Sequence, residues 1–248
     1  MGAPQRGSAR RRGGALWAVW IGAIAVLAML AGCGGGSEGA SSTTSAASLD
    51  GLTAAQVLAK AHAVAGAAKS VRLSGDLAPG VTVDLLLAGV ARGSGTVIQQ
   101  GGRIELVRVG NDLYFKADDE TLSNTVAGGD ATIVAKIAGR YVKGGVDTAG
   151  FADFAALLDL VGFVNTGLKP EGAISRVPGV PVDGVPTVGL KSPDADGGGI
   201  LYVASHGDPY PLRLQPSTGA EAITMSDWNA AATIEAPPAD HVIDITDL

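Results

Sequence analysis

The sequence contains a single cysteine, Cys33, among 248 residues, together with three histidines. One thiol excludes an intramolecular disulfide and a zinc site built from several thiolates. Aromatic residues make up only 4% of the chain, which disfavours a binding face that stacks several rings on sugars. Stability therefore has to come from the burial of aliphatic side chains.

Catalytic signatures are also scarce. The histidines, His62, His206 and His241, lie in unrelated local contexts, and none has metal-ligand spacing or a triad-like neighbourhood. The chain has neither an S-x-x-K pair nor a G-x-x-x-x-G-K-[ST] phosphate loop. The sequence therefore predicts a protein that is not an enzyme and that has no cofactor.

The first 32 residues have the pattern of an export signal. Arg6, Arg10, Arg11 and Arg12 form a basic start, and a nearly continuous apolar run follows from Gly14 to Leu30. The run ends in small residues suited to cleavage. A short N-terminal membrane helix is the alternative interpretation, and the Arg10-Arg11 pair alone gives only weak support to twin-arginine export.

The tetrad Leu30-Ala31-Gly32-Cys33 resembles the bacterial lipobox. That resemblance implies residues 1–32 as a lipoprotein signal peptide, cleavage before Cys33, and acylation of the Cys33 thiol, for example with palmitate. Two or more acyl chains on one residue hold a protein stably on a membrane. The resemblance thus predicts a chain anchored on the outer, extracytoplasmic face of the cell membrane.

Removal of residues 1–32 takes away four of the eighteen basic residues and none of the twenty-four acidic ones. The mature chain then has a net charge of −10. This charge disfavours nucleic acid as a partner and disfavours an electrostatic grip on anionic headgroups. Attachment to the membrane would depend on the lipid anchor.

Residues 33–48 form the acylated cysteine and a tether of Gly, Ser, Thr and Ala with one charge. Fifteen residues of such a flexible coil span roughly 20 Å. The run SSTTS is compatible with O-glycosylation, although a plain linker is the simpler interpretation. Residues 49–248 show no second linker, which predicts one domain.

Within this domain, Thr53 and Gln56 fit a capping box that starts a helix ending near Ala68. Further helices are expected at 118–138, interrupted at Gly128-Gly129, and at 151–164. Gly101-Gly102 is expected to form a two-residue hairpin turn. Strands are expected at 71–77, 81–90, 96–100, 103–109, 113–116, 173–177, 185–191, 200–205, 212–215 and 222–228.

This order of a helix, a meander, helices and a second meander predicts an α+β fold. We expect a single curved antiparallel sheet, a half-barrel, with helices packed on its concave face and an apolar cavity between them. An open sheet of nine or more strands tends to curl, which provides the concave side.

Two acidic clusters have alternative interpretations. Asp194 and Asp196 match the start of a calcium loop but lack its later ligands, so a hairpin loop is the better interpretation. Asp118, Asp119 and Glu120 precede a helical stretch and suit its N-terminus. No metal site is predicted.

Several segments resemble the LppX/LprG-type lipoproteins of the actinobacterial cell envelope, which are related in fold to the LolA and LolB carriers. They are NDLYFK (111–116), RYVKG (140–144), VDGVPTVGL (182–190), LYVASHGDPYPLRLQ (201–215) and DWNAAATIEAPPADHV (227–242), together with the lipobox and tether. The resemblance implies an apolar pocket for acyl chains, and some members of that group carry glycolipids or acylglycerols toward the outer envelope.

The first functional hypothesis is therefore a lipid-anchored carrier that binds an acyl lipid or glycolipid and moves it within or across the envelope. Alternatives are a tethered interaction module that docks on an envelope transporter or enzyme without a lipid pocket, and, ranked last, a lipid-anchored hydrolase. The candidate cavity residues are aliphatic or aromatic and come from the predicted strands and helices: Val83, Leu85, Leu87, Val97, Leu106, Phe115, Leu157, Val161 and Phe163.

Overall fold

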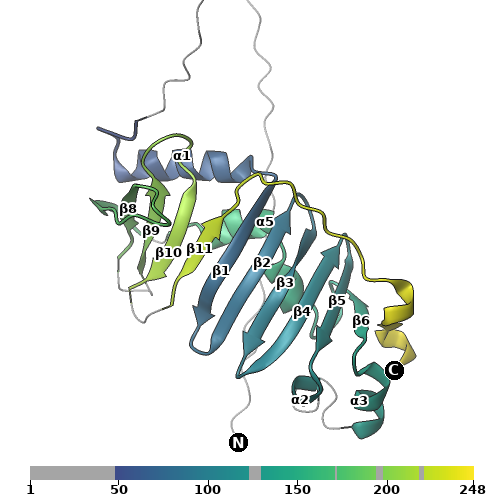
Figure 1. Ribbon diagram of the computed structural model, residues 1–248. Coiled ribbons are helices and arrows are strands. Elements are labelled where there is room, and N and C mark those ends of the chain that lie inside the picture. The colour runs from purple at the N-terminus through teal and green to yellow at the C-terminus, as the bar shows by residue number, and fades with distance from the viewer. Residues whose placement is uncertain (1–47, 123–129, 171, 194–197, 218–220) are drawn as a thin grey trace, which may run out of the picture. The chain divides into compact units, whose positions relative to one another are not determined.

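The computed structural model describes residues 48–122, 130–170, 172–193, 198–217 and 221–248, which belong to one compact unit. This unit is built on a single twelve-stranded sheet (Figure 1). In chain order the strands are β1 (Ser70–Ala78), β2 (Val81–Ala88), β3 (Arg92–Gln99), β4 (Gly102–Val109), β5 (Asp112–Ala117), β6 (Tyr141–Gly145), β7 (Ser175–Pro178), β8 (Thr187–Lys191), β9 (Gly199–Ala204), β10 (Pro211–Pro216), β11 (Ile223–Ser226) and β12 (Val242–Asp244).

The sheet is two antiparallel meanders joined in the middle. Its spatial order is β12-β6-β5-β4-β3-β2-β1-β11-β10-β9-β8-β7, so β1 pairs with β2 on one side and with β11 on the other. The predicted open, curved, single sheet is confirmed. It has one exception to antiparallel pairing, because β12 runs parallel to β6. Neither β6 nor β12 was among the predicted strands.

Alternation along the strands divides the sheet into an inner and an outer face. Val83, Leu85 and Leu87 of β2 are buried, whereas Thr82 and Asp84 are exposed. One inner row of paired residues crosses the three strands β8, β9 and β10 as Leu190, Leu201 and Leu214. The apolar side chains of both meanders thus point to the same side.

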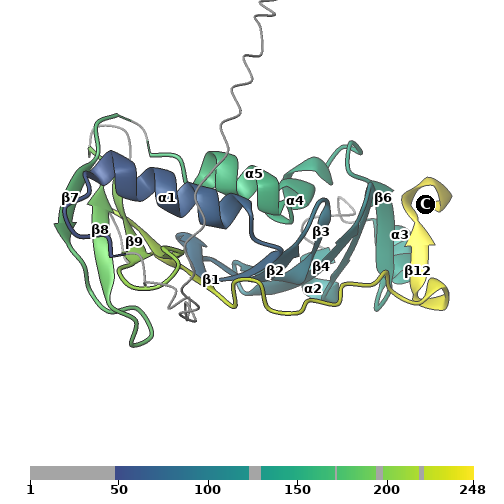
Figure 2. The same cartoon turned by 90° about the horizontal axis from the view of Figure 1, so that it is seen from above.

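Helices α1, α4 and α5 lie on that concave side of the sheet (Figure 2). Helix α1 (Ala54–Gly66) crosses one half, and α4 (Ala152–Leu157), α5 (Leu160–Gly162) and a π-helix, η2 (Phe163–Gly167), cover the other. The predicted capping box is confirmed, since the Thr53 hydroxyl accepts from the Gln56 amide and the Gln56 side chain accepts from the Thr53 amide. The short elements are α2 (Asp119–Thr121), α3 (Ala131–Ile137), and the 3₁₀ turns η4 (Ala239–His241) and η5 (Ile245–Asp247).

The sequence predicted one continuous helix at 151–164, and this prediction is wrong because the helix is interrupted. It ends at Leu157 and restarts at Leu160, where the Asp159 carboxylate accepts from the Val161 amide as a new N-cap. An aspartate side chain that bonds to a nearby backbone amide competes with helix continuation. The break allows the segment to follow the curved sheet beneath it.

The predicted turn at Gly101-Gly102 is shifted by one residue. Gln99 pairs with Gly102, so the turn residues are Gln100 and Gly101, with φ values of 52° and 87°. Two successive positive φ values define the type I′ turn that matches the twist of a hairpin. Gly102 belongs to β4 instead.

Two glycines let the helical segment approach the sheet closely. A Cβ on Gly93 of β3 would lie 2.7 Å from the Cβ of Leu158, and one on Gly144 of β6 would lie 2.7 Å from the ring of Phe151. The Phe151 ring also packs edge-on against Phe115, with ring centroids 5.3 Å apart. This half of the concave face is therefore filled with packed side chains.

Candidate functional site

The larger cavity lies over the other half of the concave face, between α1, the chain that follows η2, and strands β8 to β10. We call it the leucine cleft. Its volume is about 280 Å³, just below the usual range of about 300–1,000 Å³ for ligand pockets. Five leucines supply most of its apolar side chains: Leu58, Leu168, Leu190, Leu201 and Leu214.

Regular structure fixes the walls of the cleft. Strand pairing places Leu190, Leu201 and Leu214 side by side on three neighbouring strands. Leu58 comes from α1, one turn after Ala54, and is half-buried against the core. On the same helix, the His62 Nε2 atom lies 2.8 Å from the Leu168 carbonyl oxygen, and this contact ties α1 to the residue after η2.

The cleft is also lined by two polar residues, Lys169 and Ser192, each followed by a proline, Pro170 and Pro193. The Ser192 hydroxyl accepts a hydrogen bond from the Gly199 amide at 2.9 Å, which makes it part of the strand end. An apolar interior with an exposed lysine at the rim suits a hydrocarbon tail whose polar end stays near water.

A second cavity of about 200 Å³ lies at the far end of α1. Its walls come from the C-terminal turn of α1, the β2–β3 turn and the α5–η2 segment. Val90 and Val161 line it and are 82% and 47% exposed, so much of their apolar surface faces water. The remaining lining residues are Ala65, Gly66, Ala68, Gly89, Leu160, Val164 and Asn165.

The nine predicted cavity residues are placed mostly in the solid part of the domain. Six of them, all on strands, are at most 5% exposed and belong to the continuous core: Val83, Leu85, Leu87, Val97, Leu106 and Phe115. Leu157 and Phe163 are half-buried against that core. Val161 lines the second cavity, and none of the nine lines the leucine cleft.

Sequence reasoning missed the leucine cleft because its residues come from separate segments. Only strand pairing brings Leu190, Leu201 and Leu214 together, and they are 24 residues apart in the chain from first to last. A usable signal was present: each of the three is an apolar residue in a strand of the second meander. The prediction instead followed the first meander, whose aliphatic alternation is more regular, and the residues chosen there belong to the core.

Of the other predicted features, only some lie in the described part of the chain. Asp118 caps α2 as expected, since its carboxylate accepts from the Thr121 amide at 2.7 Å. The same carboxylate accepts from the Arg103 amide at 2.8 Å, and the bond from Arg103, followed by that from Thr121, lowers the pKa of Asp118. Cys33, the signal segment and Asp194 and Asp196 lie outside the described residues. Within the described residues no three His, Cys, Asp or Glu side chains gather as a metal site.

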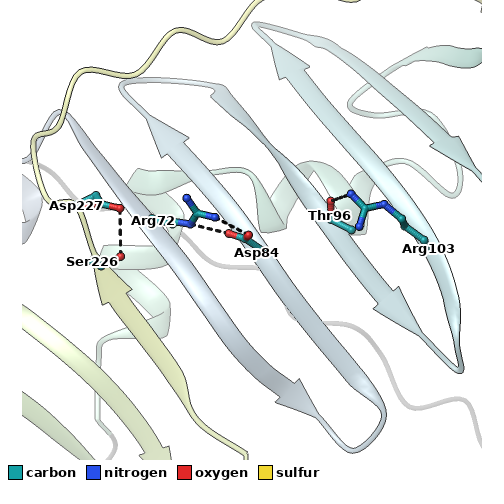
Figure 3. A network of polar contacts seen from close by, with 6 residues as sticks. All are labelled: Arg72, Asp84, Thr96, Arg103, Ser226 and Asp227. Carbon is teal, nitrogen blue, oxygen red and sulfur yellow. Dashed lines mark hydrogen bonds and ion pairs between the residues drawn. The ribbon is translucent and has the colours of Figure 1, made fainter. Parts of the chain in front are cut away.

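The outer face of the sheet has a row of polar pairs across neighbouring strands (Figure 3). Arg72 of β1 binds Asp84 of β2 through two hydrogen bonds of 2.8 and 2.6 Å, and the Arg103 guanidinium donates to the Thr96 hydroxyl. Further along, the Tyr141 hydroxyl donates to Glu105 at 2.9 Å. Partial burial, followed by this contact with a carboxylate, raises the pKa of Tyr141 to about 12.

Comparison with solved structures places the fold. The crystal structure of LprF from Mycobacterium bovis superposes with a TM-score of 0.50 over 74% of this chain and 96% of that chain, at 17% sequence identity. The chain shares the fold of LprF. The lipoprotein LppX from Mycobacterium tuberculosis has a TM-score of 0.46 and 14% identity, over 73% of this chain and 99% of that chain.

The likeness to LprF is one of architecture. No protein-family model matches the chain, and no curated protein matches it either. At 17% identity, the likeness to LprF shows a shared fold alone. In the described part of the chain, no helix has the length and apolar character needed to span a bilayer.

Proposed function

We propose that this chain is a lipid-anchored protein of the cell envelope that binds an acyl lipid in the leucine cleft and carries it within or across the envelope. The cleft carries the proposal, because it is an apolar space on the concave side of the sheet, held open between α1 and β8–β10. The lipobox at Cys33 and the LprF fold support the same conclusion.

The proposed mechanism is partition, with no bond broken. Each methylene that leaves water contributes about 0.8 kcal/mol, so a chain segment of several methylenes in a dry cleft binds firmly. The cleft volume of about 280 Å³ accommodates part of a long chain, and the remainder would extend past the rim. A polar head group, whether phosphate or glycan, would stay outside near Lys169.

The direct test is lipid binding by the chain that starts at Cys33. Native mass spectrometry of gently purified protein is expected to show a bound lipid, and the delipidated protein is expected to bind a fluorescent fatty acid. Absence of both signals would contradict the carrier proposal while leaving the anchor untouched.

The anchor has a separate test. In a bacterial host that processes lipoproteins, Cys33→Ser is expected to remove the acyl mass from the purified chain, as measured by intact mass spectrometry, because acylation needs the thiol. Adding Ser37→Cys to this variant provides a control, since the restored thiol lies outside the lipobox. A parent chain that keeps residues 1–32 and has no acyl mass on Cys33 would show that residues 1–32 act as a membrane helix.

A second candidate function, a tethered interaction module, is supported by one observation. On the other half of the concave face, the segment that contains α4 and α5 packs directly on the sheet at Gly93 and Gly144. A protein with a solid body needs no cavity for docking on an envelope transporter. Lipid binding by the cleft distinguishes the two functions.

A further inference from the structure

The loop between β7 and β8 is an apolar hairpin that projects beyond the edge strands of the sheet (Figure 2). We call residues 179–186 the valine–proline hairpin. Val180 is 46% exposed and Val185 is 39% exposed, and Pro181 and Pro186 are exposed beside them. Asp183 is the single charged residue in the hairpin.

The hairpin is rigid although its apolar side chains face water. Val182 and Val185 exchange two backbone hydrogen bonds of 3.0 and 2.8 Å around the Asp183-Gly184 turn, where both φ values are positive. The Thr187 hydroxyl donates to the Val180 carbonyl at 2.6 Å. A preorganised apolar protrusion binds an apolar surface with little loss of conformational freedom.

The base of the hairpin is fixed to the neighbouring turn between β9 and β10. The Ser205 amide and hydroxyl both donate to the Pro186 carbonyl, each at 3.0 Å. Three exposed ionisable residues lie beside the hairpin: Arg176 in β7, and His206 and Asp208 in the turn between β9 and β10. The exposed valines and prolines on the two arms of the hairpin are therefore suited to an apolar partner, while the Asp183 carboxylate at the turn would stay among the polar headgroups.

Strand β7, which leads into the hairpin, also holds the first residues of the domain. The Arg176 side chain in β7 donates to the carbonyl oxygens of Leu49 and Leu52, both at 2.9 Å. Arg176 lies three residues before the hairpin begins. The chain that leads back to Cys33 therefore joins the domain beside β7, and fifteen residues extend to at most about 50 Å.

From this geometry we propose that the valine–proline hairpin inserts the exposed valines and prolines of its two arms into the surface of the lipid bilayer to which Cys33 is anchored. The inference rests on the proposed lipid anchor. Two valines and two prolines bind a bilayer weakly, and anchoring through the predicted tether compensates, because a short tether raises the local concentration of the hairpin to about the millimolar range. The contact would orient the β7 edge of the sheet toward the membrane.

The test uses the single thiol. The chain starting at Cys33 is coupled through Cys33 to maleimide phospholipid in phosphatidylcholine vesicles, with Val185→Trp as the reporter. Coupling is expected to lower acrylamide quenching of the new indole several-fold and to introduce quenching by brominated lipid. The parent chain, in which Trp228 is the only tryptophan, gives the background.

Leu77→Trp is the matched control, because Leu77 is 46% exposed near the opposite ends of the strands, at the β1–β2 turn. Its indole is expected to stay accessible to acrylamide after coupling. Adding Val180→Asp to Val185→Trp is expected to restore acrylamide access. Equal access of the Val185→Trp indole before and after coupling would overturn the inference, whether or not another protein binds the hairpin.

Failure of this inference is distinguishable from failure of the proposed function. Fluorescent fatty acid binding by the uncoupled Val180→Asp, Val185→Trp chain reports on the leucine cleft, which contains neither residue. Retained binding with no insertion would reject the hairpin contact alone. Loss of binding in the parent chain would reject the carrier function alone.

Discussion

Truncation of Leu106 to alanine is expected to lower the free energy of unfolding by about 2–5 kcal/mol, the range for fully buried leucines. Leu106 is 1% exposed, lies in the inner row of β4, and pairs with Phe115 on β5. Because the α4–α5 segment packs closely on this half of the sheet, the truncated site cannot be filled by solvent. Urea unfolding followed by circular dichroism provides the measurement.

The matched control is Leu77→Ala, the same change at a leucine that is 46% exposed on β1. Its cost is expected to stay within about 0.5 kcal/mol, as for other surface substitutions. Similar small costs for both variants would mean that Leu106 already faces an open space. The result therefore decides whether the predicted cavity residues of the first meander form core or pocket.

Replacing Leu58 by tryptophan is expected to weaken binding of a fluorescent fatty acid by about tenfold or more, which corresponds to about 1.4 kcal/mol. Leu58 is half-buried on α1 and lines the leucine cleft. A larger ring at this position occupies part of a cavity of about 280 Å³ that the acyl chain needs. A fluorescence titration of the delipidated chain from Cys33 measures the change.

Ala59→Trp is the control for this variant, since Ala59 is the next residue on α1 and is exposed. It introduces the same ring on the solvent side and is expected to leave binding unchanged. Circular dichroism of both variants confirms that α1 is intact. Unchanged affinity in a folded Leu58→Trp variant would place the acyl chain elsewhere, and the second cavity beside Val161 would be the next site to test.

The two outcomes together separate the carrier from the interaction module. A large loss of unfolding free energy in Leu106→Ala, together with weakened lipid binding in Leu58→Trp, supports a domain with a packed core on one half and a lipid site on the other. A costly Leu106→Ala without any lipid binding in the parent chain supports the interaction module. The proposed function thus predicts distinct effects for two leucines that look alike in the sequence.

Local patterns were sufficient for most of the elements. The capping box at Thr53 and Gln56 predicted the start of α1, because side-chain and backbone groups only three residues apart decide that structure. Alternation in β2 predicted which of its side chains are buried. The turn at Gln100 and Gly101 was displaced by one residue, since two adjacent glycines leave the register of a hairpin to the pairing of whole strands.

Long-range contacts decided the rest. Strand β12 pairs with β6, about a hundred residues earlier in the chain. Because β12 has only three residues, its sequence is too short to show a strand pattern. The break at Asp159 depends on the curvature of the sheet below it as well as on its own cap. The glycines at 93 and 144 permit close packing only because Leu158 and Phe151 happen to lie above them.

The sequence by itself predicted a lipobox, a tether and one α+β domain; the lipobox and the tether stay predictions, and the single curved sheet is confirmed. The tertiary structure decided where free volume remains. Whether an aliphatic side chain meets a helix or an empty space depends on what packs opposite it, and a pattern of alternation contains no information about that partner. For this reason, the predicted pocket residues of β2 to β5 are core, and the leucine cleft lies on β8 to β10.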